Sequence, residues 1–219
     1  MQKIMFNDRY ELTDAVIEGR KIMTRRLIDP MPKDCATVHK NCWGANWSDE
    51  PMSLVVDRDT GGIYCKYCGN GVRLHDGGYH YKTKYEVGEV VAVAQSYEAA
   101  GFDPGYCIEG GQFAQKHAGW HNKMFVKPAL MSHRIRITGI KCERLQDISD
   151  EDCFREGISE SWYESTDTTT YGYADEKKGT AVEFDTPRKA FAALIDKVSG
   201  RGTWASNPWV VVYEFELVK

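Results

Sequence analysis

The spacing of apolar residues predicts a first helix over residues 8–18. Leu12, Ala15 and Val16 recur at intervals that place them on one face of a helix. Gly19 follows at the position where a glycine with positive φ commonly ends a helix. We therefore expect the chain to leave the helix at this glycine and to continue as an extended segment.

Further helices and strands follow from the same patterns. Alternation of polar and apolar residues indicates half-buried strands, and an apolar stripe behind a capping residue indicates a helix. Thr186 caps the clearest helix, which has Pro187 in its first turn and ends at Gly200. In chain order, the expected elements are strands over 22–27 and 90–97, a loop over 98–119, a strand over 134–140, a short helix over 149–155, a loop over 162–183, the helix after Thr186, and a strand over 209–218.

Strands that are far apart in the sequence have to pair in this arrangement, because helices and loops separate them. We therefore expect the α+β class, with a small mixed β-barrel and flanking helices. Residues 28–84 interrupt the pattern with prolines, glycines and four of the seven cysteines. We interpret this segment as a Cys-rich insertion in a single domain that spans residues 1–219.

The overall charge limits the classes of partner. Lys and Arg number 28 and Asp and Glu number 32, so the net charge is 28 − 32 = −4, whereas proteins that coat long nucleic acids are usually basic. Neither a signal peptide nor an apolar run long enough to cross a membrane is visible. We expect a cytoplasmic protein with no membrane partner, whose cysteines are free or bind metal.

The densest group of cations follows the first predicted helix and consists of Arg20, Lys21, Arg25 and Arg26, around Thr24. Such a run commonly lies on a solvated edge strand, where charges discourage aggregation. It can also bind a phosphate group or a base oxygen. The charges alone leave both interpretations open.

Three segments resemble a known family. GRKIMTRR, which begins at Gly19, carries the G-x-K-x-x-T-x-R signature of ASCH domains, which belong to the PUA-like barrel superfamily. HRIRITGIKCERLQDISDEDCFREGI, at 133–158, is similar to the strand-and-helix block of phage- and prophage-type ASCH proteins, and NPWVVVYEFELV, at 207–218, to their closing strand. The resemblance implies a PUA-like β-barrel whose cleft accepts RNA or a modified nucleoside.

A smaller branch of that family hydrolyses N4-acetylcytidine to cytidine and acetate, and the resemblance implies that Lys21, Thr24 and Glu156 are catalytic here. A threonine hydroxyl becomes a nucleophile beside a base, and a lysine with a lowered pKa can be that base. A carboxyl group can carry a proton to the leaving nitrogen. Because Lys21 and Thr24 would point to opposite faces of a regular strand, we expect a bend or bulge between Gly19 and Thr24.

Other residues are candidate ligand contacts. The cations Arg20, Arg25 and Arg26 suit a phosphate or a base oxygen, Tyr97 could stack on a base, and Lys123 could extend a positive rim. The alternatives to the enzyme are a non-catalytic module of phage or mobile-element origin that binds RNA or modified nucleic acid, and a protein-interaction domain.

The insertion has the composition of a zinc site. The motif CKYC lets two thiolates reach one tetrahedral ion, and the glycine that follows permits a tight turn. A structural zinc ion would also stabilise a segment with little apolar content. The expected ligands are Cys35, Cys42, Cys65 and Cys68, with His39 or His75 as a replacement for one of them.

Overall fold

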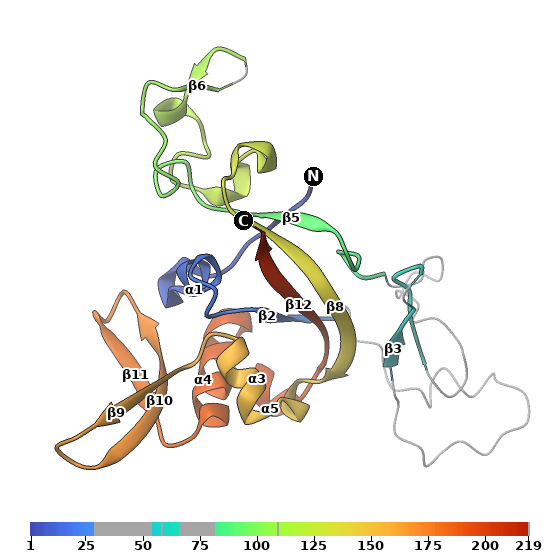
Figure 1. The fold of residues 1–219 in the computed structure, drawn as a ribbon, viewed down its shortest axis with the longest axis vertical. Coiled ribbons are helices and arrows are strands. Elements are labelled where there is room, and N and C mark those ends of the chain that lie inside the picture. The colour runs from blue at the N-terminus through green and yellow to red at the C-terminus, as the bar shows by residue number, and fades with distance from the viewer. Residues whose placement is uncertain (29–53, 58, 66–81, 109, 219) are drawn as a thin grey trace, which may run out of the picture.

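A mixed five-stranded sheet forms the centre of the computed structural model, which describes residues 1–28, 54–57, 59–65, 82–108 and 110–218 (Figure 1). In spatial order its strands are β1 (Lys3–Ile4), β5 (Val90–Val93), β8 (Arg134–Arg144), β12 (Trp209–Val218) and β2 (Met23–Leu27). β1 pairs with β5 in parallel, and the other neighbours are antiparallel. The chain's beginning, middle and end therefore lie side by side.

The strands of this sheet do not close into a barrel within the described residues, where β1 and β2 are its edges. The longest pairing joins β8 to β12, and its register shifts between Glu214 and Phe215. An irregularity of this kind bends a strand and increases its twist. The α+β class is confirmed, and the sheet is a curved open one over the described part of the chain.

Helices cover one side of the sheet. They are the 3₁₀-helix η1 (Asp8–Tyr10) and the α-helices α1 (Leu12–Ile17), α3 (Asp150–Arg155), α4 (Pro187–Ser199) and α5 (Thr203–Ser206). Thr186 accepts a hydrogen bond from the backbone N–H of Lys189 and caps α4. Gly19 has φ +76°, as expected after α1. The expected helix over 8–18 is divided at Glu11, which adopts a left-handed conformation with φ 52°.

A second sheet occupies the segment that the sequence predicted to be a loop over 162–183, so that prediction is wrong. Its strands are β9 (Ser159–Tyr163), β10 (Thr168–Asp175) and β11 (Thr180–Phe184), in the order β11-β10-β9. Gly172 permits a close approach between strands: an added Cβ would lie 2.4 Å from the carbonyl oxygen of Val182. This sheet packs on α4 (Figure 1).

The remaining elements are short. Two hairpins are formed by β3 (Leu54–Val56) with β4 (Ile63–Cys65) and by β6 (Cys107–Ile108) with β7 (Gln112–Phe113), and the 3₁₀-helices are η2 (Ala114–Lys116), η3 (Lys123–Phe125), η4 (Pro128–Leu130) and η5 (Leu145–Asp147). The second hairpin corrects the expected loop over 98–119. Among the described residues no helix is long and apolar enough to span a membrane.

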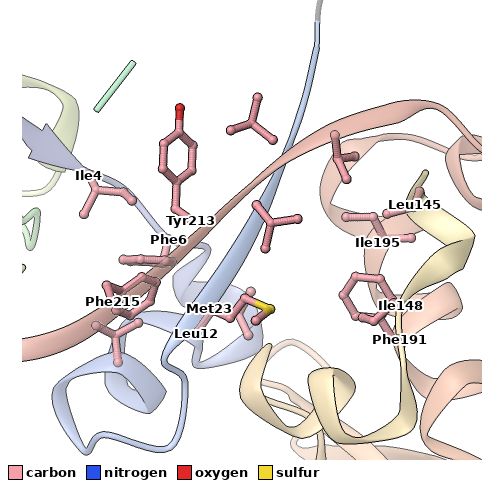
Figure 2. Close-up of a cluster of buried hydrophobic side chains, with 14 of the residues drawn as sticks. Ile4, Phe6, Leu12, Met23, Leu145, Ile148, Phe191, Ile195, Tyr213 and Phe215 are labelled. Carbon is pink, nitrogen blue, oxygen red and sulfur yellow. The ribbon is translucent and has the colours of Figure 1, made fainter. Parts of the chain in front are cut away.

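The main hydrophobic core lies between the five-stranded sheet and the helices. Figure 2 shows Phe6 and Phe215 beside each other near β12, and their ring centroids are 5.8 Å apart. Phe191 from α4 lies near Ile148 on the other side of this view. A separate, smaller core surrounds Tyr97. Because the main core fixes β2 against α4, it also positions the residues that surround a cavity between them.

Candidate functional site

A cavity of about 260 Å³ lies between β2, the residues before η1, the end of α3 and helix α4. Its walls are apolar on the α4 side, and polar groups come from β2 and from the residue that caps α3. Most small-molecule sites combine apolar walls with a few polar groups in this way. The lining residues are Phe6, Asn7, Leu12, Lys21, Thr24, Arg25, Arg26, Leu27, Glu156, Phe191, Leu194, Ile195, Val198 and Ser199.

Lys21 and Glu156 form a buried ion pair in this cavity. The distance from Lys21 Nζ to Glu156 Oε2 is 2.5 Å, and Nζ also donates to the Glu156 carbonyl oxygen at 2.7 Å. Only 2% of the Lys21 side chain and 6% of the Glu156 side chain are exposed. Two groups that are 135 residues apart in the sequence are therefore held in direct contact.

The chain bends at Arg20, just after Gly19, within the stretch where a bend or bulge was expected. The β2–β12 ladder begins at Met23, so Lys21 precedes the strand. The backbone N–H of Lys21 donates instead to the carbonyl of Ala15, at the end of the helical segment. The straight ladder that would have pointed Lys21 and Thr24 to opposite faces does not form, and both residues line the same cavity.

Burial lowers the pKa of Lys21 below the ordinary lysine value of 10.5. Glu156 acts in the opposite direction, because its carboxylate favours the charged amine, and the positive charges of Arg26 and Arg25 lower the pKa further. Desolvation is the largest of these effects, so the neutral amine is more accessible than in an exposed lysine.

Thr24 places a hydroxyl group at the cavity. It is 5% exposed and lies opposite Tyr213 in the β2–β12 ladder. Its hydroxyl makes no hydrogen bond with a residue in the described ranges. A hydroxyl without a competing partner can react or bind a ligand.

Arg25 binds three carboxylates and is almost completely buried. Its Nη1 donates to Glu156 Oε1 at 3.1 Å, and its Nη2 lies 2.6 Å from Glu143 Oε1 and 2.8 Å from Asp152 Oδ2. Burial lowers its pKa, but the neighbouring carboxylates outweigh this effect, and the net shift is upward. The guanidinium thus holds the Glu156 carboxylate from the side opposite Lys21. Arg25 is therefore not the free ligand contact that the sequence suggested.

Arg26 is the cation of this group that is most available to a ligand. Its Nη2 donates to the Met5 carbonyl oxygen at 2.6 Å, and its guanidinium lies 5.6 Å from the centre of the Phe6 ring. Within the described part of the chain it has no carboxylate partner. Because an arginine has five N–H donors, several remain for a bound molecule.

Three predicted ligand contacts lie elsewhere. Arg20 forms an exposed ion pair with Glu18 and does not line the cavity. Tyr97 is completely buried in the second core, where its hydroxyl accepts a hydrogen bond from the Lys127 backbone. Lys123 contacts the residues before α1 at the edge of a neighbouring depression. Charge and a position at a strand end do not reveal which side chains face a cavity.

The sequence missed the partners of Arg25 and the apolar walls. Glu143 and Asp152 lie within the segment 133–158, but nothing in their spacing indicates that both contact β2. The wall formed by Phe191, Leu194 and Ile195 has helical spacing, which predicts core residues and does not distinguish a cavity wall from a packed interior.

The predicted zinc ligands fall largely outside the described residues. Cys35, Cys42 and Cys68 lie there, and of Cys65 only the backbone at the end of β4 is described. Within the described ranges, no three His, Cys, Asp or Glu side chains are grouped so that they could hold a metal ion.

Comparison of the chain with protein-family models, curated proteins and solved structures finds no match. Function is therefore inferred from the geometry of the cavity and from the resemblance of the sequence motifs.

Proposed function

We propose that this chain is an ASCH-type amidohydrolase of PUA-like ancestry that removes the acyl group from an N4-acylated cytidine. One observation carries the proposal: Lys21 Nζ lies 2.5 Å from Glu156 Oε2 in the cavity that Thr24 also lines. These are the three residues to which the sequence resemblance assigns catalysis. A lysine, a hydroxyl and a carboxylate around one cavity can perform acyl transfer.

In the first half of the proposed reaction, Thr24 Oγ1 attacks the acyl carbon and neutral Lys21 Nζ takes the hydroxyl proton. The new C–O bond moves the carbonyl electrons onto oxygen, and the ammonium group formed on Lys21 can stabilise this oxyanion. The intermediate collapses by breaking the bond between the acyl carbon and N4. Glu156, in contact with Lys21, passes the proton to that nitrogen, and cytidine leaves.

In the second half, water attacks the acyl-threonine ester. Lys21 Nζ takes a proton from the water, the ester bond breaks, and the proton returns to Thr24 Oγ1. When the acyl group is acetyl, the second product is acetic acid, which leaves as acetate after losing its proton to solvent. Each cycle consumes one water molecule and regenerates all three side chains, so no redox cofactor is required for the balance.

The size of the cavity supports a small substrate. A volume of about 260 Å³ is slightly below the usual range for drug-sized ligands and suits one nucleobase with its acyl group. The buried cations also favour a small substrate over a long nucleic acid. Lys21 and Arg25 donate hydrogen bonds to carboxylates of the protein, so these donors do not contact a phosphate backbone. The alternative function is a non-catalytic RNA-binding module.

A direct assay distinguishes the hydrolase from the RNA-binding module. Purified protein is incubated with N4-acetylcytidine, and cytidine and acetate are quantified; binding of single-stranded RNA is measured in parallel as the salt concentration is varied. We expect equal amounts of the two products and weak, strongly salt-dependent RNA binding. An absence of products together with tight RNA binding would instead support the non-catalytic module.

Structural zinc is a separate proposal that is supported only by the cysteine spacing in the insertion. Protein purified without chelator should contain close to one zinc per chain, and replacing Cys65 and Cys68 together with serine should remove it. Elemental analysis checks this, with Cys107→Ser as the matched control because Cys107 is an exposed free thiol on β6. Zinc-free wild-type protein would contradict the proposal.

A further inference from the structure

An open depression of about 470 Å³ adjoins the cavity. The two share four lining residues, so one bound molecule could extend from one into the other. The shared residues are Phe6, Asn7, Arg26 and Val198, and the depression adds Met5, Asp8, Arg9 and Lys123. Seven of the fourteen residues around the cavity are apolar, whereas three of the eight residues around the depression are cations.

Two guanidinium groups on this depression have free donors. Arg26 makes one hydrogen bond, to the Met5 carbonyl, and has no carboxylate partner among the described residues. Arg9 donates from Nε and Nη2 to the two carboxylate oxygens of Asp175, at 2.9 and 3.1 Å, which leaves its Nη1 unused in the described structure. Asp175 is 2% exposed, so its charge lies behind Arg9 and away from solvent.

The other two charged residues of the depression largely satisfy each other. Lys123 Nζ contacts Asp8 Oδ1 at 2.6 Å and Thr13 Oγ1 at 3.2 Å, and it also donates to the Phe6 carbonyl. Lys123 therefore uses all three of its donors within the protein. The attraction for an anion comes from Arg26 and Arg9, whose planar forks match the oxygens of a phosphate group.

We propose that the substrate is a nucleotide that carries a terminal phosphate, with its acylated base in the cavity and its phosphate at Arg26 and Arg9. This inference rests on the proposed function, because it assigns the second half of the same substrate. The shared Asn7 and Phe6 lie between the two ends, where a sugar would pass. The phosphate subsite contributes affinity and selects the nucleotide over the free nucleoside.

The test compares kcat/KM for N4-acetylcytidine 5′-monophosphate with that for N4-acetylcytidine. We expect the nucleotide to be favoured at least about tenfold, mainly through KM, and the preference to fall as salt increases, because salt screens exposed charges. Arg9→Gln combined with Asp175→Asn, which removes both charges of the pair, should lower the preference. Asp8→Asn, which removes the negative charge but keeps an acceptor for Lys123, should raise it.

Arg20→Gln is the matched control. It removes one cation of an exposed ion pair outside both cavities, so the ratio should stay at the wild-type value. Equal kcat/KM values for nucleotide and nucleoside would overturn the phosphate subsite and leave the hydrolase intact. A clear preference for an acetylated base inside a short RNA over the mononucleotide would also overturn the phosphate subsite and leave the hydrolase intact.

The subsite can still be judged if neither compound is hydrolysed, an outcome that would refute the proposed function itself. Calorimetry then compares cytidine 5′-monophosphate with cytidine. Binding of the monophosphate that is at least about tenfold tighter, and that weakens in the Arg9→Gln, Asp175→Asn variant, would support the subsite. Equal or undetectable binding of both would overturn it.

Discussion

Replacing Lys21 with methionine is expected to lower kcat for N4-acetylcytidine at least about 100-fold, which is the lower end of what a general base contributes. Methionine keeps the length and apolar character of the buried stem but cannot take a proton from Thr24. Steady-state kinetics check this result. Turnover within a few-fold of wild type would show that Lys21 is not the base.

The pH dependence of kcat/KM for the wild-type protein is a second test of Lys21 as the base. The neutral amine is the active form, so kcat/KM should rise with pH as Lys21 loses its proton. Because burial lowers the pKa of Lys21, the rise should have its midpoint below 10.5. The variant should lack this rise.

The Lys21 variant needs a control for its stability. Removal of the Lys21 amine leaves Arg25 as the only ion-pair partner of the Glu156 carboxylate among the described residues. Lys21→Met combined with Glu156→Gln removes both charges of the buried pair. Its thermal unfolding should lie closer to wild type than that of the single variant if charge imbalance is the main structural cost. Both variants should be inactive, so inactivity with normal unfolding identifies the chemical role.

Replacing Arg25 with methionine is expected to lower the free energy of unfolding by about 3–5 kcal/mol, the range seen when a buried charge pair loses one partner. The change leaves Glu143, Asp152 and Glu156 without the guanidinium that all three contact. Denaturant titration followed by circular dichroism measures the change.

Arg20→Met is the control for this stability prediction. Arg20 belongs to the same basic run, but its ion pair with Glu18 is exposed, and such pairs contribute at most about 1 kcal/mol. We expect its unfolding curve to overlie that of wild type. If the free energy of unfolding of Arg25→Met were as close to wild type as that of this control, burial of the three carboxylates would not depend on Arg25.

The local elements could be predicted because their signals lie within a few residues. Gly19 ends the first helical segment with positive φ, and Thr186 caps α4, as their residue types indicate. The loop predicted over 162–183 is wrong because a composition rich in Thr, Gly and Tyr does not exclude strands, and Gly172 provides the space that lets β10 approach β11. Cross-strand contact of that kind is a tertiary property.

The site could be predicted only in part. The approach of Glu156 to Lys21 depends on how α3 packs beside the start of β2, where the Ile22 N–H donates to the Arg155 carbonyl oxygen. No residue pattern along the chain encodes that contact, and only the resemblance pointed to it. The same limit explains Arg25, which the sequence predicted to be a ligand contact, whereas its side chain is 1% exposed and bound to three carboxylates.

Thr24 is the proposed nucleophile, so removing its hydroxyl should abolish hydrolysis. Valine replaces its hydroxyl with a methyl group of similar size, so the cavity should keep its shape while losing the nucleophile. Cytidine and acetate released from N4-acetylcytidine are measured for wild type and for Thr24→Val under identical conditions. We expect equal release of both products by wild type and none above background by the variant. No release by wild type, or undiminished release by Thr24→Val, would show that Thr24 is not the nucleophile of an amidohydrolase.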